Sequence, residues 1–248
     1  MLNIARTRRD DPDCAHLKNG DHQMNDVSAA TDAMASVTHE PMLFYSPGAC
    51  SLASHIALEE TGKPYKPMET LLSQKQHLTP EYLAVNPRGK VPALIADGRV
   101  ITENTAILTY IGLTYPETGM WPTDTIDQMH CISQMAWFSN TPHISQRAKF
   151  RPYRFVDDEG MHEAVSAKAK ANYWQDMKEI DDLIAGKKWI MGDSYTVVDP
   201  YALVFYGWGA SHALPMDELK AFTQHKNQML ERPAVRAVLE REKNPHFK

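Results

Sequence analysis

The chain has 248 residues, of which 43% are hydrophobic and 23% charged, and its formal net charge is −5. No apolar run approaches the roughly 20 residues that span a bilayer, and a net negative charge argues against a nucleic-acid binder. We therefore expect a globular protein of one large or two small domains, with small molecules or other proteins as partners, and no membrane or nucleic acid.

Residues 1–41 differ from the rest of the chain because they are polar, mixed in charge and without helical or strand periodicity. We predict a disordered extension here, since such a segment cannot bury enough apolar surface to fold. It resembles neither a secretory signal nor a transit peptide. The three cysteines, Cys14, Cys50 and Cys131, form no paired spacing, which favours a reducing compartment and a cytoplasmic location.

Regular patterns begin at Met42. In chain order we expect a strand at 42–45, a helix at 51–61, a strand at 65–68, a weak helix at 80–85, a hairpin of 91–96 and 99–101, and a helix from 103 to about 115. Asp97-Gly98 joins the hairpin strands, since this dipeptide favours tight turns between antiparallel strands. The order βαβαββα predicts one domain over residues 42–117.

The pattern becomes purely helical after a linker of two prolines and a glycine at 116–124. An all-α domain is expected over 125–248, with helices at 126–150, 167–184, 197–206, 217–230 and 233–242. The helix at 197–206 is apolar all round, so we expect it at the centre of this domain. Thr196 and Asp199 have the spacing of a capping box and are interpreted as structural.

Four segments occur in a fixed order: SPGACSL at 46–52, NPRGKVPAL at 86–94, TENTAI at 102–107 and YTVVD at 195–199. Together they resemble the soluble glutathione transferases, and the first is similar to the bacterial beta class. The resemblance covers essentially all of the chain from Met42 onward. It implies a fold of class α+β/α, in which a thioredoxin-like βαβαββα domain precedes the all-α domain. It also implies glutathione as cosubstrate and a homodimer as the working unit.

Cys50 directly precedes the first predicted helix. A thiolate there meets unpaired backbone N–H groups and the positive end of the helix dipole, so we expect a lowered pKa. A buried, inert cysteine is the alternative. The position three residues on, where thioredoxin-type motifs have a second cysteine, is Ala53. Cys50 therefore lacks an internal disulfide partner, and external glutathione is its expected resolving partner.

The resemblance assigns glutathione binding to Cys50, Lys90, Val91, Pro92, Glu103 and Asn104. It implies a cis peptide bond before Pro92 and backbone pairing of glutathione at this point. Thr102 is expected to cap a helix whose N-terminus holds the γ-glutamyl carboxylate, with Glu103 beside the ammonium group. Family members usually have Ser, Gly or Ala in place of Asn104.

Two further catalytic residues are expected from the resemblance: Ser51, bonded to the glutathione sulfur, and His143, which approaches the sulfur from the helical domain. Ile144 follows, where the beta class often has lysine. Arg147 and Arg151 continue the face of His143 at four-residue steps, and they either bind an acidic second substrate or form a solvated face. The eleven histidines show no metal-binding spacing, so we expect no metal.

Three functions remain open. The first is conjugation of reduced glutathione to small electrophiles, a detoxification chemistry, with Cys50 at the sulfur site. The second is a glutathione-dependent thiol transferase or peroxidase that works through a Cys50 mixed disulfide. The third is a non-catalytic binding module, which the departures at Asn104 and Ile144 keep open. The sequence does not identify the electrophile.

Overall fold

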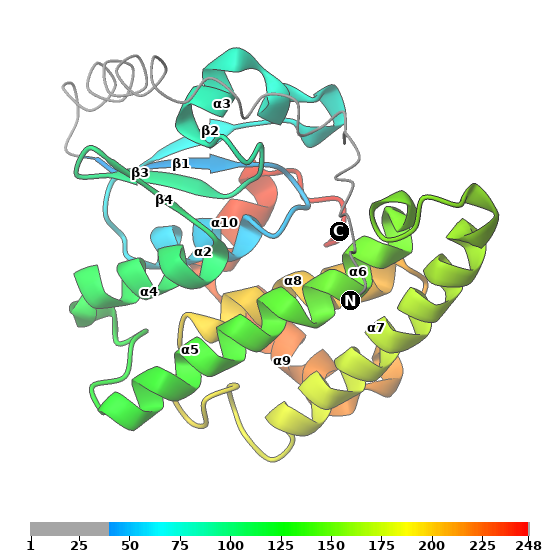
Figure 1. Cartoon of the computed structure of the whole chain (residues 1–248). Coiled ribbons are helices and arrows are strands. Elements are labelled where there is room, and N and C mark those ends of the chain that lie inside the picture. Colours follow the sequence, from blue (N-terminus) through cyan, green and yellow to red (C-terminus); the bar gives the residue numbers. More distant parts are fainter. Residues whose placement is uncertain (1–39, 248) are drawn as a thin grey trace, which may run out of the picture.

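The computed structural model describes residues 40–247, which form a four-stranded sheet with its helices, followed by a bundle of longer helices (Figure 1). A thioredoxin-like part is followed by an all-helical part, as the sequence predicts. The predicted extension at 1–41 lies outside the described residues except for its last two positions.

The strands are β1 (Met42–Tyr45), β2 (Lys66–Glu69), β3 (Ala93–Ala96) and β4 (Arg99–Thr102), in the order β2-β1-β3-β4. β1 pairs parallel with β2 and antiparallel with β3, which in turn pairs antiparallel with β4. Asp97 and Gly98 have φ of 49° and 70°, the two positive values that a tight hairpin turn requires. The predicted hairpin is confirmed.

The two faces of the sheet carry different helices. Side chains of β1 alternate, so Leu43 and Tyr45 pack with the core around α2 (Leu52–Glu60) and α4 (Asn104–Thr114). Phe44, on the opposite face, packs with Tyr82 of α3 (Pro80–Val85). In Figure 1, α3 accordingly lies above the sheet and α2 and α4 below it. The end of β1 thereby leads directly to the N-terminus of α2.

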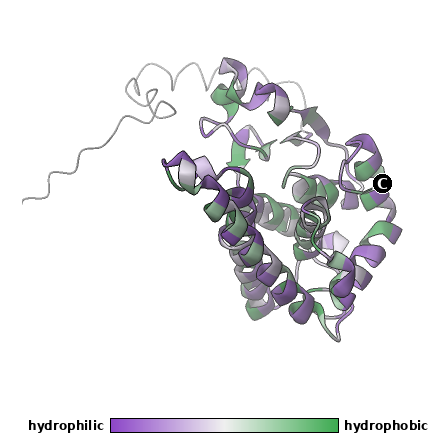
Figure 2. Cartoon of the chain, turned by 90° about the vertical axis from the view of Figure 1, so that its right-hand side faces the viewer, coloured by the Kyte–Doolittle hydropathy of each residue, from purple (hydrophilic) through white to green (hydrophobic). Residues whose placement is uncertain are grey.

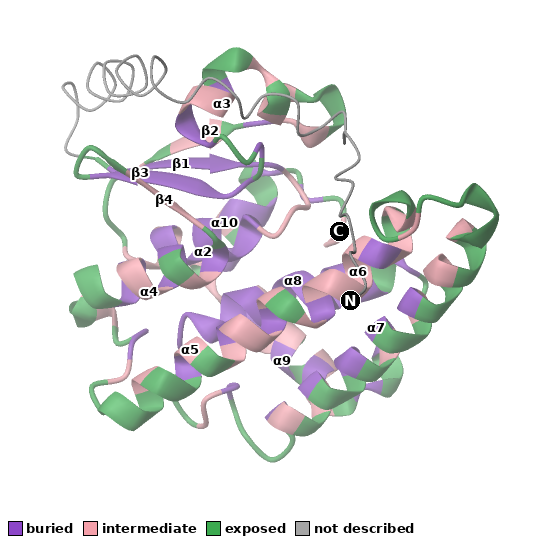
Figure 3. Cartoon of the chain, viewed as in Figure 1, coloured by how far each residue is buried: buried purple, intermediate pink, exposed green. Residues whose placement is uncertain are grey.

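The helical part surrounds one buried helix. Its helices are α5 (Thr125–Asn140), α6 (Pro142–Phe150), α7 (His162–Ile184), α8 (Val198–Ser211), α9 (Lys220–Glu231) and α10 (Pro233–Arg241). Short 3₁₀ turns lie at 72–74, 76–78, 116–118, 152–154, 159–161 and 216–218. Every residue of α8 from Val198 to Gly209 is buried, as predicted for the central helix (Figure 3). The outer helices combine hydrophilic and hydrophobic residues along their length (Figure 2).

The prediction of one helix over 126–150 is wrong, because the chain breaks at Thr141 between α5 and α6. Thr141 has φ −124° and ψ −76°, which is not helical. Pro142 follows and has no N–H with which to continue the helical hydrogen bonds, so it begins a new helix instead. The break sets the direction of α6, which carries His143.

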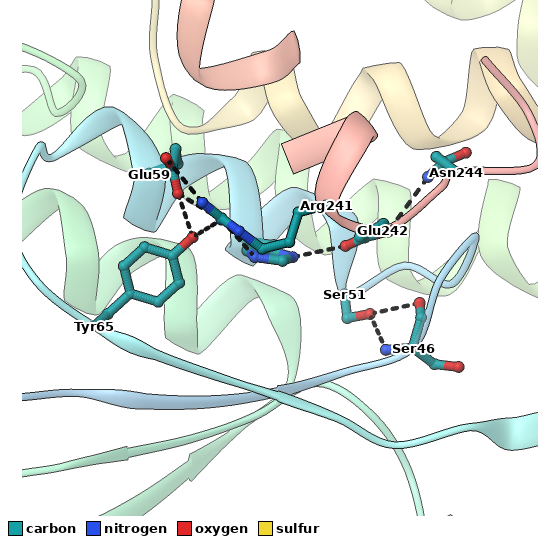
Figure 4. A network of polar contacts seen from close by, with 8 residues as sticks. Ser46, Ser51, Glu59, Tyr65, Arg241, Glu242 and Asn244 are labelled. Atoms are coloured by element: carbon teal, nitrogen blue, oxygen red, sulfur yellow. Dashed lines mark hydrogen bonds and ion pairs between the residues drawn. The ribbon is translucent and has the colours of Figure 1, made fainter. Parts of the chain in front are cut away.

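Ion pairs fix α10 against α2. Arg241 donates to Glu59 and Tyr65 (Figure 4). Arg232, which directly precedes α10, forms a bidentate ion pair with Glu60. Beneath them, the ring of His55 lies 2.7 Å from the Glu242 carboxylate, fully buried. Because α2 begins at the turn that carries Cys50, these contacts also position that turn.

No helix of residues 40–247 is long and apolar enough to cross a membrane. Within the same range, no group of three or more His, Cys, Asp or Glu side chains is placed to hold a metal ion. Cys50 and Cys131 are free thiols.

Candidate active site

Cys50 lies in the turn between β1 and α2, and its thiol donates a hydrogen bond to the carbonyl oxygen of Val91 at 3.6 Å. Burial raises the pKa of this thiol from 9.0 to about 12, and the opposing effects of Arg147 and Asn104 are smaller. The predicted lowering of the pKa is therefore wrong. Burial of the sulfur outweighs the positive charge of Arg147 and the hydrogen bond from Asn104, so the thiol stays protonated and donates.

Ser51 does not face the site, so its predicted bond to a ligand sulfur is wrong. Its side chain is fully buried, accepts from the backbone N–H of Ser46 at 3.0 Å and donates to the Ser46 carbonyl oxygen at 3.3 Å. Figure 4 shows Ser51 turned toward Ser46. Adjacent residues of a helical turn point about 100° apart, so Ser51 closes the turn that Cys50 occupies.

The Val91–Pro92 peptide bond is cis, as predicted. The backbone of Lys90, which precedes this bond, is fixed by two hydrogen bonds. Its carbonyl oxygen accepts from the Tyr82 hydroxyl at 2.6 Å and from Asn86 Nδ2 at 2.7 Å. The Lys90 side chain itself is exposed. This segment therefore enters β3 with its backbone fixed beside Cys50.

Helix α4 begins one residue later than predicted. Its N-cap is Glu103, not Thr102, and no side chain caps the helix. Glu103 has φ of 70°, a left-handed value that a non-glycine residue adopts only when its surroundings enforce it. Its carboxylate is exposed, 3.9 Å from Arg88 Nη1. The first amides of α4 thus remain free of side-chain acceptors next to an exposed acid.

Asn104 connects α4 to the turn of Cys50. Its Nδ2 donates to the Cys50 carbonyl oxygen at 2.9 Å, and its Oδ1 accepts from the Ser54 hydroxyl at 2.7 Å. Both polar atoms of the side chain therefore bond within the protein, whereas the backbone N–H of Asn104 belongs to the uncapped first turn of α4.

A buried polar cluster that the sequence analysis missed lies beneath these residues. The Tyr201 hydroxyl on α8 lies 3.2 Å from Ser139 Oγ on α5, which lies 3.2 Å from Thr105 Oγ1 on α4. Burial raises the pKa of the Tyr201 phenol, and the nearby Cys50 adds to the effect. Hydroxyl groups from three helices thus contact one another next to the site.

His143 approaches the site from α6. Its ring centroid lies 5.2 Å from that of Trp208, whose Nε1 donates to the Gly48 carbonyl oxygen at 2.9 Å. Burial, with Arg147 and Lys90 as further causes, lowers the pKa of His143 to about 4, so the ring is neutral near pH 7. Trp208 belongs to the site although no local sequence motif marks it.

The C-terminal segment also reaches the site. His246 Nε2 lies 3.1 Å from the same Gly48 carbonyl oxygen, so the ring and Trp208 both donate to it. Gly48 has φ of 73°, and a Cβ there would lie 2.9 Å from atoms of His246 and Pro245. The close approach of this segment therefore requires glycine.

A thioredoxin-like sheet with a cysteine at the start of its first helix, opposite a cis-proline and followed by a helical domain, defines a class of thiol-binding proteins. Residues 41–112 match the family model for the N-terminal domain of glutathione S-transferases. Glutathione S-transferase GstA of Escherichia coli O157:H7 is 30% identical over 203 residues, which cover 81% of this chain and 98% of that protein. The chain therefore belongs to the glutathione S-transferase family.

Solved structures agree with this placement. A glutathione transferase homologue from Sulfitobacter with bound glutathione superposes with a TM-score of 0.79 at 28% identity, covering 82% of this chain and 99% of the other. A beta-class glutathione S-transferase from Sphingomonas chungbukensis gives a TM-score of 0.72 at 32% identity, covering 81% and 98%.

Proposed function

We propose that this protein is a glutathione transferase that adds reduced glutathione to small electrophiles, with Cys50 beside the glutathione sulfur. One observation carries the proposal. Cys50 is hydrogen-bonded to Val91, before the cis-proline, and to Asn104, at the start of α4. These are the segments that the family resemblance assigns to glutathione, and here both bond to Cys50, Val91 to its thiol and Asn104 to its backbone carbonyl oxygen.

Two of the three residues of the tripeptide have a chemically suited partner. The uncapped N-terminus of α4 offers backbone N–H groups and a positive dipole end to the γ-glutamyl carboxylate. The exposed carboxylate of Glu103 suits the ammonium group. The backbone of Val91 and Pro92 suits the cysteinyl residue, which brings the glutathione sulfur close to Cys50.

In the proposed reaction the glutathione thiol loses its proton to solvent. The thiolate sulfur attacks the electrophilic carbon, a C–S bond forms, and the bond to a leaving group such as chloride breaks with the electron pair. The Cys50 S–H turns from the Val91 carbonyl oxygen to the thiolate and donates to it, which lowers the cost of ionising glutathione. With a pKa of about 12, roughly one Cys50 in 10⁵ is ionised at pH 7.

Thiol transfer is the second candidate. There the Cys50 thiolate attacks a glutathionylated disulfide, a mixed disulfide with glutathione forms, the other thiol leaves, and a second glutathione resolves the enzyme. This reaction needs an ionised Cys50, which burial disfavours. The raised pKa thus favours conjugation over thiol transfer. A non-catalytic module is the third candidate.

Calorimetric titration with reduced glutathione on the parent, Cys50→Ala, Cys50→Ser and Glu103→Gln tests the proposal. We expect saturable binding by the parent and both Cys50 variants, and binding weakened about tenfold in Glu103→Gln. For conjugation we expect Cys50→Ser, which keeps a donor, to exceed Cys50→Ala. Absence of glutathione binding by the parent favours the non-catalytic module, and equal thiol transfer by Cys50→Ser and parent excludes the mixed disulfide.

The homodimer and the cytoplasmic location that the sequence suggests belong to the proposal as well. Exposed apolar side chains at the end of α6 and in the turns that follow it, Phe150, Tyr153, Phe155 and Met161, support a partner surface. Size-exclusion chromatography coupled to light scattering measures the molar mass and so tests the dimer. A monomer at micromolar concentration contradicts it.

A further inference from the structure

Two half-buried arginines, Arg147 on α6 and Arg151 directly after it, have no anionic partner among residues 40–247. Arg147 lies four residues after His143, and Arg151 has non-helical backbone angles, φ −133° and ψ 57°. Neither guanidinium takes part in an ion pair or a side-chain hydrogen bond within the described residues. The cost of partly removing such a charge from water is normally offset by an anion. These two cations therefore lack the partner that their burial calls for.

The face that carries them is turned toward the site. The ring of His143 packs on Trp208, and Trp208 donates to Gly48, two residues before Cys50. Arg147 acts electrostatically on both Cys50 and His143, and Arg151 acts on both His143 and His77 of the sheet-containing part. The guanidinium of Arg147 therefore lies near Cys50 and His143, and that of Arg151 lies near His143 and His77.

Other charges near this position have the same sign. Lys90 adds to the positive field at His143, and Arg154 adds to it at His77. Glu103 is the only carboxylate among the charges that act on Cys50. The whole protein carries a net charge of −5, so the positive field here is a local feature rather than a property of a basic protein.

We infer that Arg147 and Arg151 bind a carboxylate of the second substrate, so that the preferred electrophiles are anionic. This inference rests on the proposed glutathione conjugation and deepens it. Glutathione also carries carboxylates, but its γ-glutamyl end is matched by the N-terminus of α4 and Glu103. The arginines approach Cys50 from α6, the opposite side, where an electrophile must meet the sulfur.

A matched pair of electrophiles tests this. 4-Chloro-3-nitrobenzoate and 4-chloro-3-nitrobenzamide both lose chloride to a glutathione thiolate and differ in one charged group. With each kcat/KM divided by its uncatalysed rate constant, we expect the parent to prefer the benzoate about tenfold or more. Arg147→Gln and Arg151→Gln should each remove most of this preference, because kcat/KM for the benzoate falls further than kcat/KM for the benzamide.

Arg99→Gln is the matched control, because it removes one exposed positive charge at the hairpin, the end of the sheet away from Cys50. It should change kcat/KM for neither substrate, and circular dichroism checks that all variants fold. Equal losses for benzoate and benzamide overturn the inference. So does a weakened affinity for glutathione itself in Arg147→Gln without a change in substrate preference, since the arginine then binds the glutathione carboxylate.

A binding measurement separates this inference from the proposed function. 3-Nitrobenzoate and 3-nitrobenzamide have no leaving group, so their calorimetric binding to the glutathione-saturated protein needs no turnover. Preference for the benzoate that is lost in Arg147→Gln supports the inference even without catalysis. Equal binding of both compounds to the parent overturns it, whereas absence of conjugation with intact benzoate preference contradicts only the proposed function.

Discussion

The indole nitrogen of Trp208 donates a hydrogen bond to the carbonyl oxygen of Gly48, 160 positions away in the chain. This bond joins the central helix of the all-α part to the turn that presents Cys50. The same carbonyl oxygen accepts from His246 at 3.1 Å. The position of the Cys50 turn is therefore set by residues of the helical part and of the C-terminal segment.

Replacing Trp208 by Phe should loosen this turn. The variant keeps an aromatic ring for His143 but removes the N–H donor, at an expected cost of about 1–2 kcal/mol in the free energy of unfolding. Glutathione affinity should fall several-fold, because the turn is part of the proposed binding frame. Urea unfolding and calorimetry measure the two effects. Trp137→Phe on α5 is the control, and equal glutathione affinities of Trp208→Phe and the parent would contradict the prediction.

The Cys50 thiol should be unusually unreactive. With its pKa raised to about 12 by burial, the thiolate fraction at pH 8 is far below that of an ordinary cysteine. Alkylation of the Cys50 peptide by iodoacetamide, followed by mass spectrometry, should be at least about tenfold slower in the native protein than in urea. Arg147→Gln should slow it further, since the guanidinium lowers this pKa. Faster alkylation in the native state than in urea would contradict the raised pKa of the Cys50 thiol.

Asn104→Ala should destabilise the protein by about 1–3 kcal/mol, because it leaves the buried Ser54 hydroxyl without its partner. It also removes one of two hydrogen bonds to the Cys50 carbonyl oxygen, which still accepts from the Ala53 N–H at 3.2 Å. The double variant Ser54→Ala/Asn104→Ala removes the orphaned hydroxyl. It should therefore cost less than the sum of the two single changes, as a double-mutant cycle measures. Additive costs would show that the two side chains do not interact as the structure describes.

Much of the fold follows from local patterns. The alternation in the strands, the Asp97-Gly98 turn and the all-round apolar sequence of α8 each determine an element without help from distant residues. The break between α5 and α6 also has a local cause, Pro142, which the continuous apolar spacing on both sides concealed. The capping box of Thr196 and Asp199 is confirmed in one of its two hydrogen bonds. The Asp199 carboxylate accepts from the Thr196 N–H at 2.8 Å, as predicted. Thr196 Oγ1, however, accepts from the Val198 N–H rather than from that of Asp199.

The site was less predictable, because its chemistry depends on contacts between distant segments. The sequence places Cys50 at a helix N-terminus, but only the packed structure shows that burial outweighs the helix dipole. Ser51 follows Cys50 in the motif yet points into the turn. Trp208 and His246 carry no motif, and only their shared contact with Gly48 shows that they belong to the site.

His212 gives the structure a pH-dependent stability. It is 7% exposed at the end of α8, packed against the rings of Phe150 at 4.5 Å and Tyr173 at 5.2 Å. Burial, with Lys149 and Lys170 among the further causes, lowers its pKa to about 4. The unfolded chain therefore binds the proton more readily, and the stability that the neutral ring contributes is lost as the pH falls from about 6.5 through 4.

His212→Phe should remove this dependence. Neither ring nitrogen has a hydrogen-bond partner among the described residues, so an apolar ring of similar size suits the position. We expect the free energy of unfolding of the variant to exceed that of the parent by a larger margin at pH 5 than at pH 8, by about 1 kcal/mol or more. Urea unfolding at both pH values measures this. The exposed His130, replaced by Phe, is the control, and a margin for His212→Phe that does not grow toward pH 5 would show that His212 is not protonated on unfolding.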